Sequence, residues 1–274
     1  MANRDRDDQP SIAAERVRQA VRQAIGYRSR PYRAAAHLTN IYFALSREGV
    51  RGLTLLRMAN RSGHEKLVTL RSLQHPFLVR PAREDVGILV NNVFREEYGQ
   101  FTTSFHPKTI IDAGAYIGDT AAYFLTRFRD ANVIALEPAD ESHFQAAQNL
   151  APYGERVRLV KRALWYTETT LRFSGRETAA SISATGTSVE TDTVPSLMHR
   201  FNLRTIDLLK LDIEGAEATV IPSGVGQWLR TVKMILVEIH GSDIERAILP
   251  LLAAEAFACH QRRSVWYCRN TNHA

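Results

Sequence analysis

The hydrophobic positions in the second half of the chain form short, nearly continuous aliphatic runs. From Thr109 onward these runs are TIIDAGA, NVIALEP, RVRLVKRALW, DLLKLDI and KMILVEIH. Runs of this length without polar alternation are typical of strands buried on both faces. Helical patterns separate or follow them at 119–129, 140–150, 216–221 and 244–257. This alternation predicts an α/β fold with a doubly wound, mostly parallel sheet covered by helices.

The first 104 residues carry a different pattern. A helical period of apolar residues predicts helices at 11–25, 37–47 and 53–60. Shorter runs predict strands at 65–72 and 76–80, then a short helix at 85–92 leading into 93–98. The Ser-, Thr- and Gly-rich stretch 169–194 predicts a hairpin or a mobile loop. We expect three parts: a basic, partly disordered or helical segment (1–33), a mainly helical N-terminal extension with short strands (34–104), and the α/β domain (105–270).

The composition is ordinary for a globular protein, with 45% apolar and 23% charged residues. No apolar run reaches the roughly 18 residues that a membrane-spanning helix needs. The first thirty residues lack the apolar core of a secretory signal, so we expect a cytoplasmic protein. Cys259 and Cys268 fit either two reduced thiols or one disulfide, and their spacing matches no metal motif.

Positive charge is concentrated in the first 108 residues, which hold 18 Lys and Arg against 10 Asp and Glu. Such an excess can serve contact with acidic polymers, although scattered arginines more often form a solvated helical face. Aromatic residues that would stack on bases are not interleaved with them, so we expect no nucleic-acid partner. The apolar face of 11–25 is mostly alanine, which favours a packed helix or a homodimer contact over a membrane surface.

A glycine-containing turn follows the first predicted strand of the α/β domain. Asp112, Gly114 and Gly118 lie in the segment DAGAYIG, and a helix is expected to begin at Asp119. In an open parallel sheet, ligands sit at the carboxyl ends of strands, and glycine lets the backbone approach them closely. The second strand ends at Glu137, 25 residues after Asp112, and its carboxylate can accept hydrogen bonds from both hydroxyls of a ribose. Turn and carboxylate together indicate a ligand that carries adenosine.

The spacing of the turn discriminates between adenosine ligands. A dinucleotide pyrophosphate prefers G-x-G-x-x-G, with bare N–H groups at the start of a helix. Here the spacing is D-x-G-x-x-x-G, and Asp119 places a negative charge at the start of the helix. That charge repels pyrophosphate but tolerates a sulfonium and an ammonium group. We therefore expect S-adenosylmethionine rather than a nicotinamide or flavin dinucleotide.

The fourth and fifth strands end in polar side chains on the same expected rim of the sheet. Asp212 and Glu214 follow the fourth strand, and Glu238 and His240 follow the fifth. A methyl transfer needs an acceptor atom held in line with the sulfonium and a base that takes its proton. Asp212, Glu214 and His240 are the candidate catalytic residues. Asp212 and Glu214 are also candidate ligands of a divalent cation such as Mg²⁺.

These polar side chains also have purely structural interpretations. The two carboxylates after the fourth strand can cap the helix expected near 216. His240 can simply form a hydrogen bond at the end of its strand. Glu217 follows one helical turn later and is expected to be a structural partner of Lys210 or Arg230.

Five segments of the chain together resemble the FkbM family of class I methyltransferases. They are IIDAGAYIGDTAAYF, VIALEP, VRLVKRALW, IDLLKLDIEGAEATVI and ILVEIHG, within about residues 105–255. Upstream, FLVRPAREDVGILVNNVFREEYG is similar to the lead-in of members linked to glycan or natural-product pathways. The resemblance implies a Rossmann-like domain that uses S-adenosylmethionine for O-methylation of a hydroxyl on a sugar, glycan or natural product.

The resemblance also implies a donor site and a type of acceptor. It carries over directly to Asp112, Gly114, Gly118 and Glu137, whereas the family often has Asn where this chain has Tyr116. The donor is expected to contact Asp112, Gly114, Ala115, Tyr116, Gly118, Asp119, Glu137, Pro138 and Ala163. The acceptor is expected to be a small molecule or a glycan.

Three other functions compete with a methyltransferase. An NAD(P)-dependent oxidoreductase could share the Rossmann-like fold, although the turn spacing and Asp119 disfavour it. A non-catalytic binding module could keep the pocket without turnover, although the intact strand ends LDIEGAE and VEIHG disfavour it. A glycan- or nucleic-acid-binding protein could use the basic segment, and its binding to anionic polymers would then depend on salt.

Overall fold

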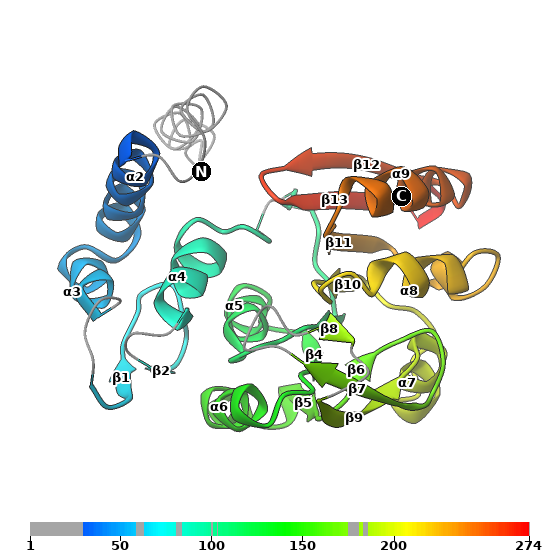
Figure 1. Cartoon of the computed structure of the whole chain (residues 1–274), viewed down its shortest axis with the longest axis horizontal. Helices are drawn as coiled ribbons and strands as arrows, with labels where there is room; N and C mark the ends of the chain where they lie inside the picture. The colour runs from blue at the N-terminus through cyan, green and yellow to red at the C-terminus, as the bar shows by residue number, and fades with distance from the viewer. Residues whose placement is uncertain are drawn as a thin grey trace. The chain divides into compact units, whose positions relative to one another are not determined.

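The computed structural model describes residues 30–58, 63–80, 84–99, 101–102, 104–174, 181–182 and 186–273 (Figure 1). The chain divides into two compact units, one that ends at Arg95 and one that runs from Glu96 to Ala274. The helix expected at 11–25 and most of the basic segment 1–33 lie outside the described residues.

The described part of the first unit contains the helices predicted at 37–47, 53–60 and 85–92 and the two predicted short strands. Its elements are α2 (Arg30–Glu48), α3 (Val50–Met58), β1 (Lys66–Val68), β2 (Phe77–Val79) and α4 (Asp85–Leu89), which continues as a π-helical turn over Val90–Phe94. Strands β1 and β2 pair antiparallel. The carboxylate of Glu48, at the end of α2, accepts the backbone N–H groups of Arg71 and Ser72, which ties the connection between the strands to this helix.

The second unit is built on a seven-stranded sheet. Its strands are β3 (Thr109–Ala113), β4 (Asn132–Leu136), β5 (Val157–Val160), β10 (Leu208–Leu211), β11 (Met234–Glu238), β12 (Phe257–Arg262) and β13 (Val265–Asn270). The order across the sheet is β12-β13-β11-β10-β3-β4-β5, and β13 runs antiparallel to both of its neighbours while the other pairs are parallel. The expected doubly wound, Rossmann-like sheet is confirmed. Strand order reverses between β3 and β10, where such folds bind ligands.

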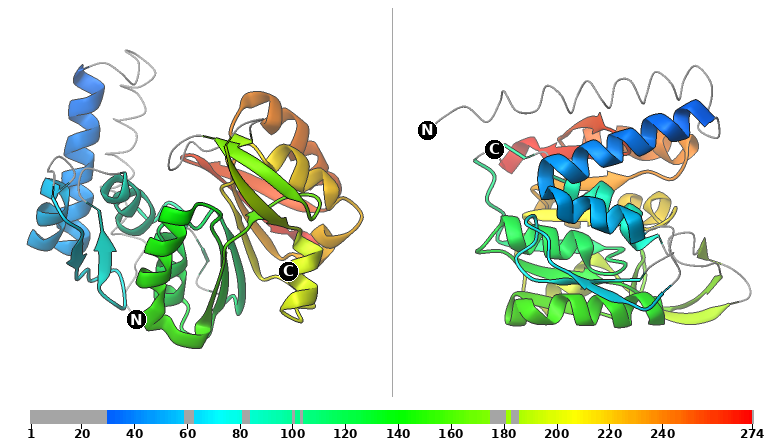
Figure 2. Two further views of the ribbon diagram at one scale, coloured as in Figure 1. Left: turned by 60° about the horizontal axis from the view of Figure 1, so that its bottom comes forward. Right: turned by 90° about the vertical axis from the view of Figure 1, so that its left-hand side faces the viewer.

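Helices cover both faces of this sheet. They are α5 (Asp119–Arg127), α6 (Asp140–Leu150), α7 (Val194–Arg200), α8 (Glu217–Ser223) and α9 (Ser242–Ala254). Helices α5 and α6 lie on one face, and α7, α8 and α9 lie on the other (Figure 2). The aliphatic runs that form β3, β4, β10 and β11 are mostly buried, and all four residues of β10 are, whereas β5 at the edge of the sheet is partly exposed. None of the described helices combines the length and the apolar character that a membrane-spanning segment requires.

The structure differs from the sequence prediction in several places. The run 156–165 was expected to be one strand, but it forms β5 and the separate strand β6 (Ala163–Leu164). Strand β6 joins β7 (Thr170–Ser174), β8 (Ser181–Ile182) and β9 (Thr187–Asp192) in a second, four-stranded sheet. The helix expected to end at 257 stops at Ala254, because Ala256 adopts a positive φ of 65° that breaks it. The hairpin of β12 and β13 follows and was not predicted.

The two cysteines of the chain lie opposite each other on this hairpin. Cys259 on β12 pairs in register with Cys268 on β13, and the two form a disulfide. Of the two states that the sequence left open, the structure therefore has the disulfide. It links the edge strand β12 to its neighbour β13.

The central position of β10 predicts that its apolar side chains dominate the stability of the second unit. Leu209 is 0% exposed, and we expect Leu209→Ala to lower the free energy of unfolding by about 2–5 kcal/mol, because it leaves a cavity in the core. Phe144→Ala on α6 is the control, since Phe144 is 66% exposed, and it should change stability by less than about 0.5 kcal/mol. Urea denaturation followed by circular dichroism measures both. Equal losses would contradict the assigned core.

Candidate active site

The carboxyl ends of β3 and β10 meet at the point where strand order reverses. After β3, the backbone turns at Gly114, which has a φ of 82°. The N–H groups of Gly114 and Ala115 both donate to the carbonyl oxygen of Leu136, at the end of β4. A Cβ on Gly114 would lie 1.9 Å from the carbonyl oxygen of Asp212, which follows β10. The turn can therefore pack against Asp212 only with glycine at this position.

This contact changes the reason for the two glycines. The sequence suggested that Gly114 and Gly118 leave room for a ligand. In the structure, Gly114 leaves room for the backbone of Asp212, and a Cβ on Gly118 would lie 2.9 Å from the side chain of Leu150 on α6. The glycines therefore allow close packing within the protein, which positions the turn and the start of α5.

Glu137 follows β4 directly beside this turn. Its Oε2 accepts the N–H of Tyr116 at 2.9 Å, and its Oε1 accepts the N–H of Ala139 at 2.8 Å. The residue is 7% exposed, and burial raises the pKa of its carboxyl to about 7, against the effect of the two backbone hydrogen bonds. Each oxygen keeps a second lone pair, so the carboxylate can still accept two more hydrogen bonds.

The other residues expected around the donor lie on the same edge of the sheet. Tyr116 is buried at a φ of 47°, and Pro138 directly follows Glu137. Asp119 lies in the first turn of α5 and is 1% exposed. Ala163 starts β6, three residues beyond Val160, whose carbonyl oxygen accepts the N–H of Glu137.

Asp112 differs from the others because it has a buried partner inside the sheet. Its Oδ1 lies 3.1 Å from Nζ of Lys210, and both side chains are at most 1% exposed. The same ammonium group donates to the carbonyl oxygen of Gly114 at 2.6 Å and lies 3.7 Å from Oδ2 of Asp212. Burial raises the pKa of Asp112, although Lys210 opposes this shift. Asp112 therefore pairs with the Lys210 ammonium group, which connects the turn after β3 to the turn after β10.

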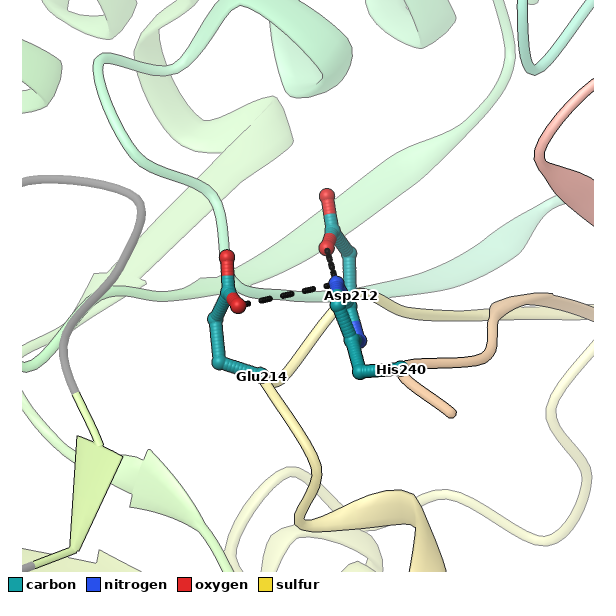
Figure 3. A group of neighbouring side chains, drawn as sticks. All are labelled: Asp212, Glu214 and His240. Atoms are coloured by element: carbon teal, nitrogen blue, oxygen red, sulfur yellow. Dashed lines mark ion pairs between the residues drawn. The ribbon is translucent and has the colours of Figure 1, made fainter. Parts of the chain in front are cut away.

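The three predicted catalytic side chains come together at the ends of β10 and β11. Figure 3 shows Asp212 and Glu214 directing their carboxylates toward the ring of His240. The Nε2 atom of His240 lies 3.8 Å from Oδ1 of Asp212 and 3.6 Å from Oε2 of Glu214. Potential metal-ligating atoms of the three residues all lie within 4.8 Å of one another. The expected cluster therefore exists, and all three side chains are partly exposed.

The other nitrogen of the His240 ring, Nδ1, is hydrogen-bonded to a buried carboxylate. Nδ1 lies 3.0 Å from Oε1 of Glu217, a residue that is 0% exposed. The hydrogen bond to Glu217 raises the pKa of His240 to about 9, against the effect of burial. The prediction that Glu217 pairs with Lys210 or Arg230 is wrong, because its partner is His240. The N-cap residue of α8 is Ala216, whose side chain makes no capping hydrogen bond.

Tyr98 completes the site from the start of the second unit. Its hydroxyl lies 3.1 Å from Oδ2 of Asp212 and 3.3 Å from Oε2 of Glu238. The single hydroxyl proton is either shared by both carboxylates in a bifurcated bond or donated to one of them while the other carries a proton of its own. Burial and the charge of Asp212 raise the pKa of Glu238 to about 7, which makes Glu238 the carboxyl that can carry it.

The segment before Tyr98 is fastened by the C-terminal hairpin. The hydroxyl of Tyr267 donates to the carbonyl oxygen of Glu97, and the hydroxyl of Ser264 donates to the carboxylate of Glu97 at 2.8 Å. Sequence reasoning missed Tyr98 because it follows no strand, although it lies in the lead-in segment FLVRPAREDVGILVNNVFREEYG that resembles the family. It also missed the position of Lys210, although a lysine inside an aliphatic strand signals a buried ion pair.

The contact between Gly114 and Asp212 predicts a specific sensitivity to substitution. Gly114→Ala combines a positive φ with a clash against backbone, and we expect it to cost about 3 kcal/mol or more of unfolding free energy. Gly226→Ala is the matched control, because Gly226 also has a positive φ, of 69°, but a Cβ there meets only the end of the Arg230 side chain, at 4.0 Å. It should cost only about 1–2 kcal/mol. Similar losses in chemical denaturation would refute the packing role of Gly114.

Comparison with known proteins places this site in a family. Residues 112–257 match the model of the methyltransferase FkbM domain, and no curated protein sequence matches the chain. Among solved structures, the chain is similar to methyltransferase FkbM from Methylobacillus flagellatus, with 14% identity, a TM-score of 0.45 and coverage of 67% of this chain. It spans 53% of that protein, about half of its length.

A second solved structure with a similar chain is the Methanococcus jannaschii fibrillarin pre-rRNA processing protein. The identity is 12% and the TM-score 0.41, over 76% of this chain and 83% of the other. The FkbM match carries the assignment, since it covers more than half of the sequence and includes the glycine turn, Glu137 and the cluster around His240. The chain belongs to the FkbM family of methyltransferases.

Proposed function

We propose that the protein is an S-adenosylmethionine-dependent O-methyltransferase that acts on a hydroxyl of a sugar, glycan or natural product. The observation that carries this proposal is the backbone contact between Gly114 and Asp212. It brings the turn suited to an adenosine-bearing donor against the cluster suited to an acceptor. Both halves of a methyl transfer therefore have a place at one edge of the sheet.

The residues around the turn fit the methyl donor. The free lone pairs of Glu137 suit the two ribose hydroxyls. Hydrogen bonds from these hydroxyls would favour the charged form of the Glu137 carboxyl, whose pKa is raised by burial. Asp119, at the start of α5, suits an ammonium group and disfavours the pyrophosphate of the competing NAD(P)-dependent oxidoreductase. Asp112, Gly114, Ala115, Tyr116, Gly118, Pro138 and Ala163 complete the proposed donor site.

The cluster of Asp212, Glu214 and His240 is the proposed acceptor site. The donor supplies an electrophilic methyl group, and the cluster orients the acceptor oxygen toward it. As the new C–O bond forms and the C–S bond breaks, the hydroxyl proton leaves to a group in this cluster. Hydroxyl acceptors suit the cluster because it offers several proton acceptors on a partly exposed rim. A non-catalytic module would need none of them.

The first prediction from this function concerns donor affinity. We expect Glu137→Ala to weaken binding of S-adenosylmethionine at least tenfold, because it removes charge-assisted hydrogen bonds worth roughly 1.5–3 kcal/mol. Isothermal titration calorimetry measures the affinity, and circular dichroism checks that the variant is folded. Asp130→Ala, an exposed carboxylate before β4, is the control and should bind like the wild type. Unchanged affinity in folded Glu137→Ala would remove Glu137 from the donor site.

The second prediction concerns turnover. Purified protein with labelled methyl donor and cell extract should yield a labelled product, and mass spectrometry should place the methyl group on a hydroxyl oxygen. With that acceptor, Asp212→Asn and His240→Ala should each lower turnover by roughly 10²-fold or more, the scale of general acid–base catalysis. Donor affinity should change by less than about threefold, because neither side chain is assigned to the donor.

The control for turnover is Asp243→Asn, which removes an exposed carboxylate three residues beyond His240. It should react at the wild-type rate. Wild-type turnover in both cluster variants would place the catalytic centre elsewhere, while a label on nitrogen or carbon would overturn O-methylation.

A further inference from the structure

The side chains of Asp212, Glu214 and His240 lie farther apart than side chains that are hydrogen-bonded directly to one another. The separations of 3.6 and 3.8 Å from the His240 Nε2 atom to the two carboxylates exceed hydrogen-bond length. Two ligands of one small cation, each at about 2.1–2.4 Å, lie about 3–4.8 Å apart. The spacing of the three groups, all within 4.8 Å, therefore matches atoms that share an ion.

The ring of His240 is oriented as in a metal ligand. Nδ1 is engaged by Glu217, which leaves Nε2 directed at the two carboxylates, as Figure 3 shows. Glu217 is held in turn by the N–H of Ile213, at 3.2 Å from Oε1. A carboxylate behind the distal nitrogen fixes the tautomer and the ring plane of histidines that bind metals. The buried Glu217 therefore fixes the ring so that Nε2, on its exposed side, faces the two carboxylates.

The carboxylates around the cluster create negative charge, which favours binding of a cation. Three carboxylates, those of Asp212, Glu214 and Glu217, surround the His240 ring at this end of the sheet. Lys210 is the nearby ammonium group, and it is already bound to Asp112 at 3.1 Å. The Oε2 atom of Glu217 is buried without a hydrogen-bond partner among the described residues. This excess of negative charge is independent of the spacing of the ligand atoms.

We propose that Asp212, Glu214 and His240 bind one divalent cation, Mn²⁺ or Mg²⁺, with Glu217 as the residue that positions His240. The proposal rests on the proposed function, because it gives the cation the task of holding the acceptor oxygen. Two carboxylates with one imidazole suit Mn²⁺ well, since oxygen ligands favour hard cations and nitrogen adds affinity for later metals. A coordinated hydroxyl also loses its proton more easily.

A proton on Nε2 of His240 is the competing occupant. In that case the ring is an imidazolium ion that neutralises the two carboxylates without any metal. The two states respond differently to added cation, because a metal site saturates at one equivalent. An imidazolium cluster takes up no Mn²⁺ at this position.

The test is Mn²⁺ binding by the full chain without a histidine tag, after treatment with chelator. Electron paramagnetic resonance of free Mn²⁺ gives the number of ions bound and their affinity. We expect one Mn²⁺ per chain with a dissociation constant below about 1 mM, and competition by Mg²⁺. Absence of a stoichiometric site up to 1 mM Mn²⁺ would overturn the proposal.

Variants locate the site. Glu214→Gln keeps the size of a partly exposed side chain and should weaken Mn²⁺ binding at least tenfold, whereas the control Asp243→Asn should bind like the wild type. Glu217→Gln should weaken binding less than Glu214→Gln, because it alters only the support of the ring. Equal affinity in Glu214→Gln and the wild type would show that Mn²⁺ binds elsewhere, which refutes the assigned ligands.

A parallel titration with S-adenosylmethionine in excess chelator separates this proposal from the function on which it rests. Donor binding without Mn²⁺ binding would refute the cation site and leave the methyltransferase proposal standing. Mn²⁺ binding without donor binding would refute the proposed function and keep the metal site. Added Mn²⁺ should broaden the imidazole NMR signals of His240 in the wild type, a readout that does not need the acceptor.

Discussion

The close approach of two turns, one after β3 and one after β10, is the constraint on which the site depends. The turns touch through backbone, with no room for a side chain at Gly114, and the N–H of Asp212 donates to the carbonyl oxygen of Ala113. Lys210 secures the junction because its ammonium group contacts Asp112, the Gly114 carbonyl and Asp212. If this junction moved, the proposed donor and acceptor sites would separate.

The charged groups of the site form two levels, a lower one buried inside the sheet and an upper one at the partly exposed ends of its strands. In the lower level, inside the sheet, the carboxylates of Asp112 and Asp212 raise the pKa of Lys210 although burial alone would lower it. Charge there is balanced within the protein. In the upper level, carboxyl groups outnumber cations, and the pKa of both Glu238 and His240 is raised. The lower level maintains the fold, and the upper level is where a positively charged or hydrogen-bond-donating ligand is stabilised.

The sequence was sufficient to predict the parallel sheet and the convergence of Asp212, Glu214 and His240, because buried strands have continuous aliphatic runs and parallel strands end on one side. It could not predict the partner of Glu217, since that contact joins the first residue of α8 to the second residue after β11 and depends on how the helix packs, not on spacing along the chain. The hairpin of β12 and β13 was missed because CHQR and CRN carry no aliphatic alternation. Helix α7 was missed although Thr193 and Ser196 form a capping box at its start.

The hydrogen bonds from Tyr267 and Ser264 to Glu97 join the first residues of the second unit to its last hairpin. Tyr98, the next residue, contacts Asp212 and Glu238. The first segment of the second unit therefore contributes to the site while the hairpin of β12 and β13 holds it in position. During synthesis on a ribosome, the sheet from β3 to β11 emerges before that support exists. A nascent chain can therefore complete the site only after Tyr267 has left the exit tunnel, which makes the finished site a late event in the folding of the protein.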